Sequence, residues 1–152
     1  MKRFAALILI MLLVFSCSAA LAERVSCPVG GFSLNLPDQF QEMPLDSVRD
    51  PQLCLFWRSL DGSLSVQAYA DYMGEVAYSD LFQVLDGTEK ESGEININGM
   101  RMLYARTDTY MMYSWMDRGN NVTLYFNYSW DDSSVRSAVD SIIRSISFDA
   151  GH

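Results

Sequence analysis

Apolar and polar residues alternate along several stretches of the chain, which is the pattern of a β-strand with one buried face. The stretch 122–130 alternates most regularly, and its apolar and aromatic positions are Val122, Leu124, Phe126, Tyr128 and Trp130. Shorter alternating runs occupy 31–37, 52–59 and 63–70. We therefore expect four strands here, with the large residues of 122–130 on the core face.

A glycine turn joins the runs at 52–59 and 63–70, because Leu60-Asp61-Gly62 lies between them. Its glycine readily adopts the positive φ that a tight hairpin turn requires. Asn98-Gly99 is a second such turn, and an alternating run at 100–106 follows it. We expect a β-hairpin at each of the two turns.

The chain continues as a meander, since turns at 107–109 and 118–121 flank a strand at 110–116. Turns of this length make the numbers of paired residues sum to an odd value. That register places the odd-numbered residues of 110–116 on the core face. Its even-numbered residues, Tyr110 and Met112 among them, share the opposite face with alternate residues of the strand that follows.

Two segments show helical periodicity instead. The apolar residues of 75–86 fall at helical spacing, and Gly87 is available to end that helix. The second segment, 132–145, has one apolar stripe at helical spacing that extends just beyond its end, formed by Val135, Ala138, Val139, Ile142, Ile143 and Ile146. Residues 131–134 offer side-chain oxygens to the first-turn N–H groups. The expected fold class is α+β, an antiparallel β meander sheet flanked by two helices.

Residues 1–22 have the organisation of an export signal. A basic start is followed by a continuously apolar run at 4–15 and by the small-x-small sequence Ala20-Leu21-Ala22. The apolar run is shorter than the about 20 residues that a membrane-spanning helix needs. We predict cleavage after Ala22, which leaves 23–152 as a single secreted or extracytoplasmic domain.

Lipidation of Cys17 is a second interpretation of the same region. Cys17 follows Val14-Phe15-Ser16, a sequence similar to a bacterial lipobox, although Phe15 stands where a small residue is usual. Cleavage before Cys17 would leave a membrane-anchored lipoprotein. Only in that case would the membrane be a partner.

Charge narrows the choice of partners. Removal of 1–22 takes away Lys2 and Arg3 and leaves nine basic against 19 acidic side chains, a net charge of −10. Nucleic acids are bound through clustered Lys and Arg side chains that contact the phosphates. The acidic balance therefore argues against a nucleic-acid partner.

Two cysteines, Cys27 and Cys54, remain after cleavage at Ala22. An exported compartment is oxidising enough to join them. A bridge between them would stabilise the domain by about 3 to 4 kcal/mol. The alternative is a pair of buried free thiols that behave as small apolar residues, and the sequence leaves both open.

The order of elements resembles that of a known group of proteins. An F-x-L-x-x-P strand at 32–37 comes first, a meander follows a helix, and a closing helix runs into I-I-R-S-I-S-F at 142–148. This order resembles the PsbP-like and DcrB-like small exported proteins over most of 28–149. The resemblance implies an antiparallel sheet flanked by helices. It also implies a protein that acts through partner binding or in an accessory role in export, usually without catalysis.

The sequence lacks the residue combinations that several common catalytic mechanisms require. The only histidine is His152, the last residue. This excludes a Ser-His-Asp or Cys-His nucleophile and an HExxH zinc site. GxGxxG, P-loop and C-x-x-C motifs are also missing, which removes support for nucleotide and dithiol-redox roles. We expect no cofactor.

Three carboxylates, Asp108, Asp131 and Asp132, are predicted to share one end of the sheet. Carboxylate oxygens bind Ca²⁺, and a pair of carboxylates can act as acid and base on a sugar. The alternative is structural, because Asp is favoured in turns and at helix N-caps. We expect the structural role for all three.

Aromatic residues on the face opposite the core offer a binding platform. Tyr110, Met112, Tyr125 and Asn127 would lie there, where exposed aromatic groups mark interaction sites. The alternative is that the helix at 75–86 covers them as a second core layer. The sequence favours a non-enzymatic, envelope-associated or secreted domain that binds a protein partner or a small ligand. The alternative function is a small carboxylate-dependent hydrolase acting on an extracellular polymer.

Overall fold

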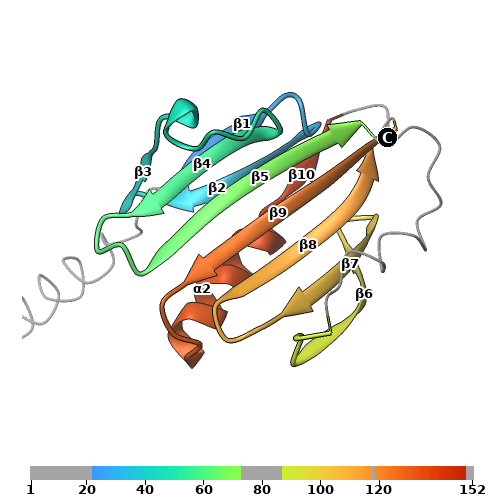
Figure 1. Ribbon diagram of the computed structural model, residues 1–152. Coiled ribbons are helices and arrows are strands. Elements are labelled where there is room, and N and C mark those ends of the chain that lie inside the picture. The colour runs from blue at the N-terminus through green and yellow to red at the C-terminus, as the bar shows by residue number, and fades with distance from the viewer. Residues whose placement is uncertain (1–21, 73–86, 118, 150–152) are drawn as a thin grey trace, which may run out of the picture.

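The computed structural model describes residues 22–72, 87–117 and 119–149 (Figure 1). Its elements in chain order are β1 (Ala22–Cys27), β2 (Phe32–Pro37), β3 (Phe40–Glu42), the 3₁₀ helix η1 (Leu45–Ser47), β4 (Leu53–Ser59), β5 (Leu64–Tyr72), β6 (Glu91–Ile97), β7 (Met100–Arg106), β8 (Tyr110–Asp117), β9 (Asn120–Tyr128), α2 (Ser133–Arg144) and β10 (Ser147–Phe148). The helix expected at 75–86 lies outside the described residues. The α+β class is confirmed, with one α-helix in the described ranges where two flanking helices were expected.

Seven strands form one antiparallel sheet in the order β3-β4-β5-β9-β8-β7-β6. The expected β4–β5 and β6–β7 hairpins and the meander from β6 to β9 are all present. Residues paired between β8 and β9 have numbers that sum to an odd value, as in Tyr113 opposite Leu124. The pairing of β5 with β9 joins the two halves of the sheet at its centre.

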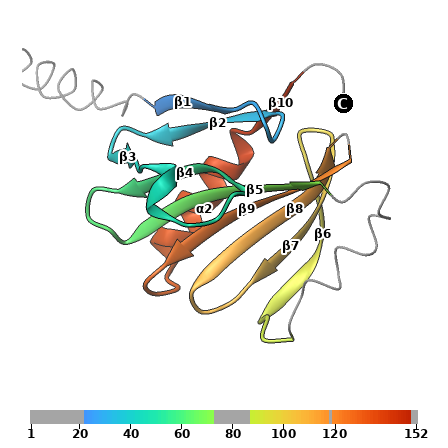
Figure 2. The same cartoon turned by 45° about the horizontal axis from the view of Figure 1, so that its top comes forward.

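A smaller sheet of three strands has the order β1-β2-β10. Figure 2 shows it above α2, and both elements contribute to the core on one face of the seven-stranded sheet. The predicted cleavage after Ala22 would remove only the first pair of the β1–β2 ladder, Ala22 with Pro37. In the described part of the chain, no helix is long and apolar enough to cross a membrane.

One hydrophobic core lies between the two sheets and α2. Its largest fully buried side chains include Trp115, Phe32, Phe126, Leu34, Leu36 and Met102. The ring of Trp115 makes edge-to-face contacts with Phe32 and Phe148, with ring centroids 5.3 Å and 5.8 Å apart respectively. Because these rings come from β8, β2 and β10, the contacts hold the small sheet to the large one.

The β6–β7 turn is fixed to the end of α2. Asn98 and Gly99 both have positive φ angles, 49° and 91°, as the Asn-Gly sequence predicts. Asn98 Nδ2 donates to the backbone oxygen of Ile146 at 2.6 Å. Asn98 therefore joins the β6–β7 turn to the segment that directly follows α2.

The predicted core face of 122–130 is correct except at its end. Val122, Leu124 and Phe126 are fully buried, but Trp130 is 57% exposed. The prediction for Trp130 is wrong because β9 ends two residues earlier, at Tyr128. The turn expected at 118–121 is also shorter, since Asn120 is already paired in β9.

Asp132 caps the N-terminus of α2, as the sequence indicates. Its Oδ1 accepts hydrogen bonds from Ser134 N at 2.8 Å and Val135 N at 2.9 Å. Hydrogen bonds from Val135 and Ser134 lower the pKa of Asp132 to about 2, because they favour the charged carboxylate. The stripe predicted for this helix is buried at Val135, Val139, Ile142, Ile143 and Ile146.

We expect Asp132 to make the folded state sensitive to acid. Its pKa is lower in the folded than in the unfolded chain, so its stabilising effect is complete above about pH 4 and is lost as the pH falls toward 2. Asp132→Asn retains a good N-cap but cannot titrate, so it should flatten the dependence of Tm on pH in this window. Asp132→Ala should lower Tm at pH 7 by about 5 °C. Thermal unfolding between pH 2 and 7 measures both effects, and an unchanged pH profile in Asp132→Asn would contradict the assignment.

Candidate functional site

Three tyrosines from neighbouring strands lie together on the face of the seven-stranded sheet that points away from α2, here termed the outer face. Tyr69 of β5, Tyr125 of β9 and Tyr110 of β8 form this tyrosine row. The ring centroids of Tyr69 and Tyr125 are 5.8 Å apart at an interplanar angle of 87°, and those of Tyr110 and Tyr125 are 5.8 Å apart at 69°. Edge-to-face contacts of this kind hold each ring in a defined orientation.

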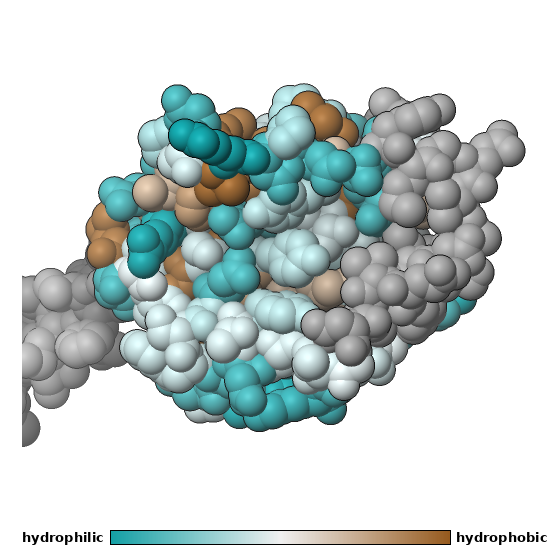
Figure 3. Space-filling view, in the orientation of Figure 1, coloured by the Kyte–Doolittle hydropathy of each residue, from teal (hydrophilic) through white to brown (hydrophobic). Residues whose placement is uncertain are grey.

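Two rings of the tyrosine row line an open cavity of about 440 Å³, here termed the outer cavity. Its lining is polar and aromatic and consists of Asp50, Gln52, Gln67, Tyr69, Asp71, Asn121, Thr123, Tyr125 and Asn127. Figure 3 views the outer face, and the surface over β5 and β9 is mostly white to teal there. The volume lies in the range typical of small-molecule sites.

Side-chain hydrogen bonds fix the amide groups of the cavity wall. Asn127 Nδ2 donates to Gln67 Oε1 at 2.9 Å, and Ser114 Oγ donates to Asn121 Oδ1 at 2.8 Å. Both amide oxygens are thereby used. Across the described ranges, no group accepts a hydrogen bond from Gln67 Nε2 or Asn121 Nδ2, so none of the described residues occupies these N–H donors.

The electrostatic character of the outer cavity is acidic. Among the described residues that line it are the carboxyl groups of Asp50 and Asp71, and none of these residues is Lys or Arg. Burial raises the pKa of Tyr69, and the negative charge of Asp50 raises it further. Burial also raises the pKa of Tyr125. Both phenol groups therefore stay neutral at ordinary pH and can donate or accept hydrogen bonds.

The structure brings together part of the platform that the sequence predicts. Tyr125 and Asn127 line the outer cavity, and Tyr110 contacts Tyr125 from the adjacent strand. Met112 is only 3% exposed, because it packs with residues of β7 in a small apolar cluster on the same face. Met112 thus offers almost no surface to a ligand, and the helix expected to cover this face, 75–86, lies outside the described residues.

Tyr69, like Gln67 and Asn121, is a member of the site that sequence reasoning missed. The alternation in 63–70 places Tyr69 on the same strand face as Gln67, but alternation does not identify the neighbouring strand. The pairing of β5 with β9 sets Gln67 opposite Tyr125 and brings Tyr69 beside that ring. The outer cavity therefore depends on a contact between segments far apart in the sequence.

The three carboxylates predicted at one sheet end are held by different partners. Asp108 forms an ion pair with Lys90, Asp131 forms one with Arg106, and Asp132 caps α2. Among the residues that the structure describes, no group of three His, Cys, Asp or Glu side chains is placed to hold a metal ion. Each of these carboxylates makes a structural contact.

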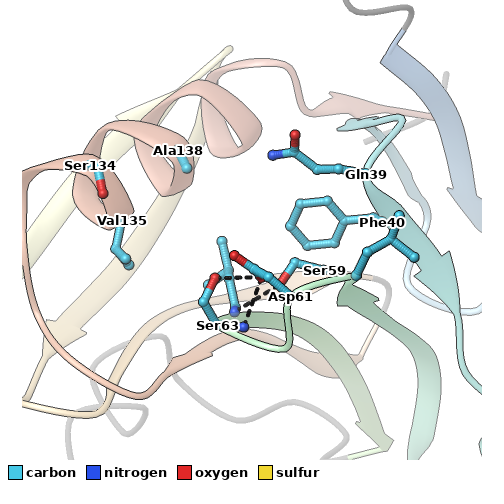
Figure 4. Close-up of a pocket in the computed structure, with 10 residues that line it drawn as sticks. Gln39, Phe40, Ser59, Asp61, Ser63, Ser134, Val135 and Ala138 are labelled. Atoms are coloured by element: carbon cyan, nitrogen blue, oxygen red, sulfur yellow. Dashed lines mark hydrogen bonds between the residues drawn. The ribbon is translucent and has the colours of Figure 1, made fainter.

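A second hollow of about 440 Å³ lies between α2 and the β4–β5 turn (Figure 4). Phe40 and Val135 on its wall are buried. Asp61 accepts hydrogen bonds from Ser59 Oγ at 2.7 Å and from Ser63 N at 3.0 Å, and bonds to these two serines lower the pKa of Asp61 to about 2. Its carboxylate is used to fix the turn, so the outer cavity is the stronger candidate site.

Cys27 and Cys54 are adjacent free thiols, with their sulfur atoms 3.1 Å apart. Cys27 is fully buried at the end of β1, whereas Cys54 in β4 is partly exposed. The hydrogen bond between the two thiols lowers the pKa of Cys27 despite burial, and the same contact raises the pKa of Cys54. The sulfur separation exceeds the about 2.05 Å of a disulfide, so the bridge stays a prediction.

Comparison with known proteins identifies the fold. No protein-family model and no curated protein matches this sequence. The structure is similar to cyanobacterial PsbP (CyanoP) from Synechocystis sp. PCC 6803, with a TM-score of 0.64 and 13% identity over 87% of this chain and 95% of that one. It is also similar to a crystal structure from Bacteroides thetaiotaomicron, with a TM-score of 0.54 and 13% identity over 85% of this chain and 49% of that one. The PsbP-like resemblance seen in the sequence is confirmed for the fold.

Proposed function

We propose that this chain is an extracytoplasmic, non-enzymatic domain that binds a small polar ligand in the outer cavity. The observation that carries the proposal is a concave surface in which two tyrosine rings lie beside amide N–H donors that have no acceptor in the described chain. The cavity stands on β5 and β9, the central strands of the sheet, and sites on such elements are held precisely. Its concavity favours a small ligand over a flat protein surface.

Residues outside the cavity support the other parts of the proposal. The export pattern of 1–22 supports an extracytoplasmic location. The PsbP-like fold and the lack of any histidine before His152 support a non-catalytic role. The hydrolase alternative has less support, because Asp131 is paired with Arg106 and neither the outer cavity nor the hollow in Figure 4 is lined by the three carboxylates.

Replacing Tyr125 by alanine is expected to weaken ligand binding at the outer cavity while the fold is retained. A thermal-shift screen with defined neutral, cationic and anionic polar compounds tests this. A compound present at 100 times its Kd adds about 2.7 kcal/mol to the stability of the wild-type chain. Tyr125→Ala should show less than half of the corresponding rise in Tm, since it removes one wall of the cavity.

Tyr104→Ala is the matched control. Tyr104 is a half-buried tyrosine of β7 that packs toward the core side and hydrogen-bonds Glu91 at 3.0 Å. It should respond to the same compounds as the wild-type chain does. Compounds that stabilise Tyr125→Ala as strongly as the wild type, or the lack of any stabilising compound, would contradict the proposed function.

A further inference from the structure

The charge on the described lining of the outer cavity disfavours an anionic ligand. Its described lining contains two carboxylates and no basic side chain. Phosphate and carboxylate ligands are held by charge-assisted hydrogen bonds from Arg or Lys. The domain that follows residue 22 also carries a net charge of −10, which repels anions at longer range. The ligand is therefore neutral or cationic.

The amide donors distinguish between these two classes. Gln67 Nε2 and Asn121 Nδ2 present N–H groups to the cavity wall, because the oxygens of both amides accept hydrogen bonds from neighbouring side chains. An N–H donor pairs with a hydroxyl oxygen but opposes an ammonium group. Asp50 and Asp71 supply acceptors on the same wall. A surface that mixes donors and acceptors matches hydroxyl groups, which act as both.

The tyrosine row supplies the remaining element of recognition. Tyr69 and Tyr125 are held nearly perpendicular to each other, so their rings present surfaces in two directions at the cavity. The C–H face of a pyranose ring is apolar and packs on an aromatic ring, while its hydroxyls reach polar groups around it. We infer that the outer cavity binds a neutral saccharide, an inference that rests on the proposed function and specifies its ligand.

Titration calorimetry of the exported chain tests the ligand class. The probes are neutral oligosaccharides of glucose in α and β linkage, of mannose, galactose and xylose, and of N-acetylglucosamine, with spermidine as the cationic probe. At least one saccharide is expected to bind, and spermidine is expected not to compete with it. Tyr125→Ala should weaken saccharide binding by at least about tenfold, and Tyr104→Ala should leave it unchanged.

Asn121→Asp provides a test that does not depend on removing a large side chain. The substitution keeps the oxygen that accepts from Ser114 and replaces the N–H donor by a second carboxylate oxygen. Saccharide affinity should fall about two- to tenfold. Affinity for spermidine should not fall, because the cavity becomes more acidic.

The outcomes separate this inference from the proposed function. Binding of spermidine that requires Tyr125, with no saccharide bound, would overturn the saccharide inference and leave the proposed function standing. Saccharide binding that is unchanged in both Tyr125→Ala and Asn121→Asp would place the ligand elsewhere and overturn both. Failure of every probe here and of every compound in the thermal-shift screen would also overturn both.

Discussion

Oxidation of the Cys27–Cys54 pair is expected to raise the free energy of unfolding by about 3 to 4 kcal/mol. The two sulfurs lie 3.1 Å apart, so bond formation requires them to approach by about 1 Å. The two thiols lose two protons and two electrons to a disulfide oxidant, which becomes two thiols. The new bond would join β1 to β4, and so link the three-stranded sheet covalently to the seven-stranded one. Loop closure in the unfolded chain is the source of the expected gain.

Urea denaturation of oxidised and dithiothreitol-reduced protein measures this difference. Cys54→Ser is the control, because reductant should leave its unfolding curve unchanged. A thiol titration of the oxidised, denatured chain reports whether the bond has formed. Free thiols at both Cys27 and Cys54 after exposure to a disulfide oxidant would contradict the prediction.

Replacement of Trp115 by alanine is expected to lower the free energy of unfolding by about 3 to 5 kcal/mol. Trp115 is fully buried, and its ring contacts Phe32 of β2 and Phe148 of β10. Alanine would leave a cavity where the two sheets meet, and the rings around it would lose their packing partner. Urea denaturation followed by far-ultraviolet circular dichroism measures the loss.

Two further tryptophan variants make the test specific. The indole Nε1 of Trp115 has no hydrogen-bond partner in the described part of the chain, so Trp115→Phe sacrifices no hydrogen bond and should cost no more than about half as much as Trp115→Ala. Trp130→Ala should change stability by about 0.5 kcal/mol or less, because Trp130 is largely exposed. A loss of less than about 1 kcal/mol in Trp115→Ala would mean that the core closes around the missing ring, contrary to this account.

Alternation along the chain predicts most of the seven-stranded sheet, because most of its strands place alternate residues in the core that lies against α2. The odd-sum register correctly buries Trp115 and Tyr113. The same rule fails at Trp130, since alternation in the sequence continues past the point where β9 ends and the cap of α2 begins. The small sheet could not be predicted, because β10 has only two residues, too few to show a period.

The candidate site is less predictable from sequence than the fold. Local periodicity assigns Tyr125 and Asn127 to the face opposite the core, and that assignment is correct. It does not reveal that Tyr69 is their neighbour, because this depends on the pairing of β5 with β9. It also does not reveal that Met112 is buried, because burial on this face depends on packing against β7. Strand order, rather than strand identity, is the information that local patterns lack.

The pairing of distant segments has a consequence for how the chain folds. The β5–β9 ladder pairs residues separated by 48 to 64 positions, and β2 pairs with β10 near the end of the chain. Contacts between distant segments slow folding, since a long loop must close before they stabilise anything. The core also needs Val139 and Ile142 of α2, which are among the last parts of the domain to be synthesised. We therefore expect the domain to complete its fold only after α2 has been synthesised.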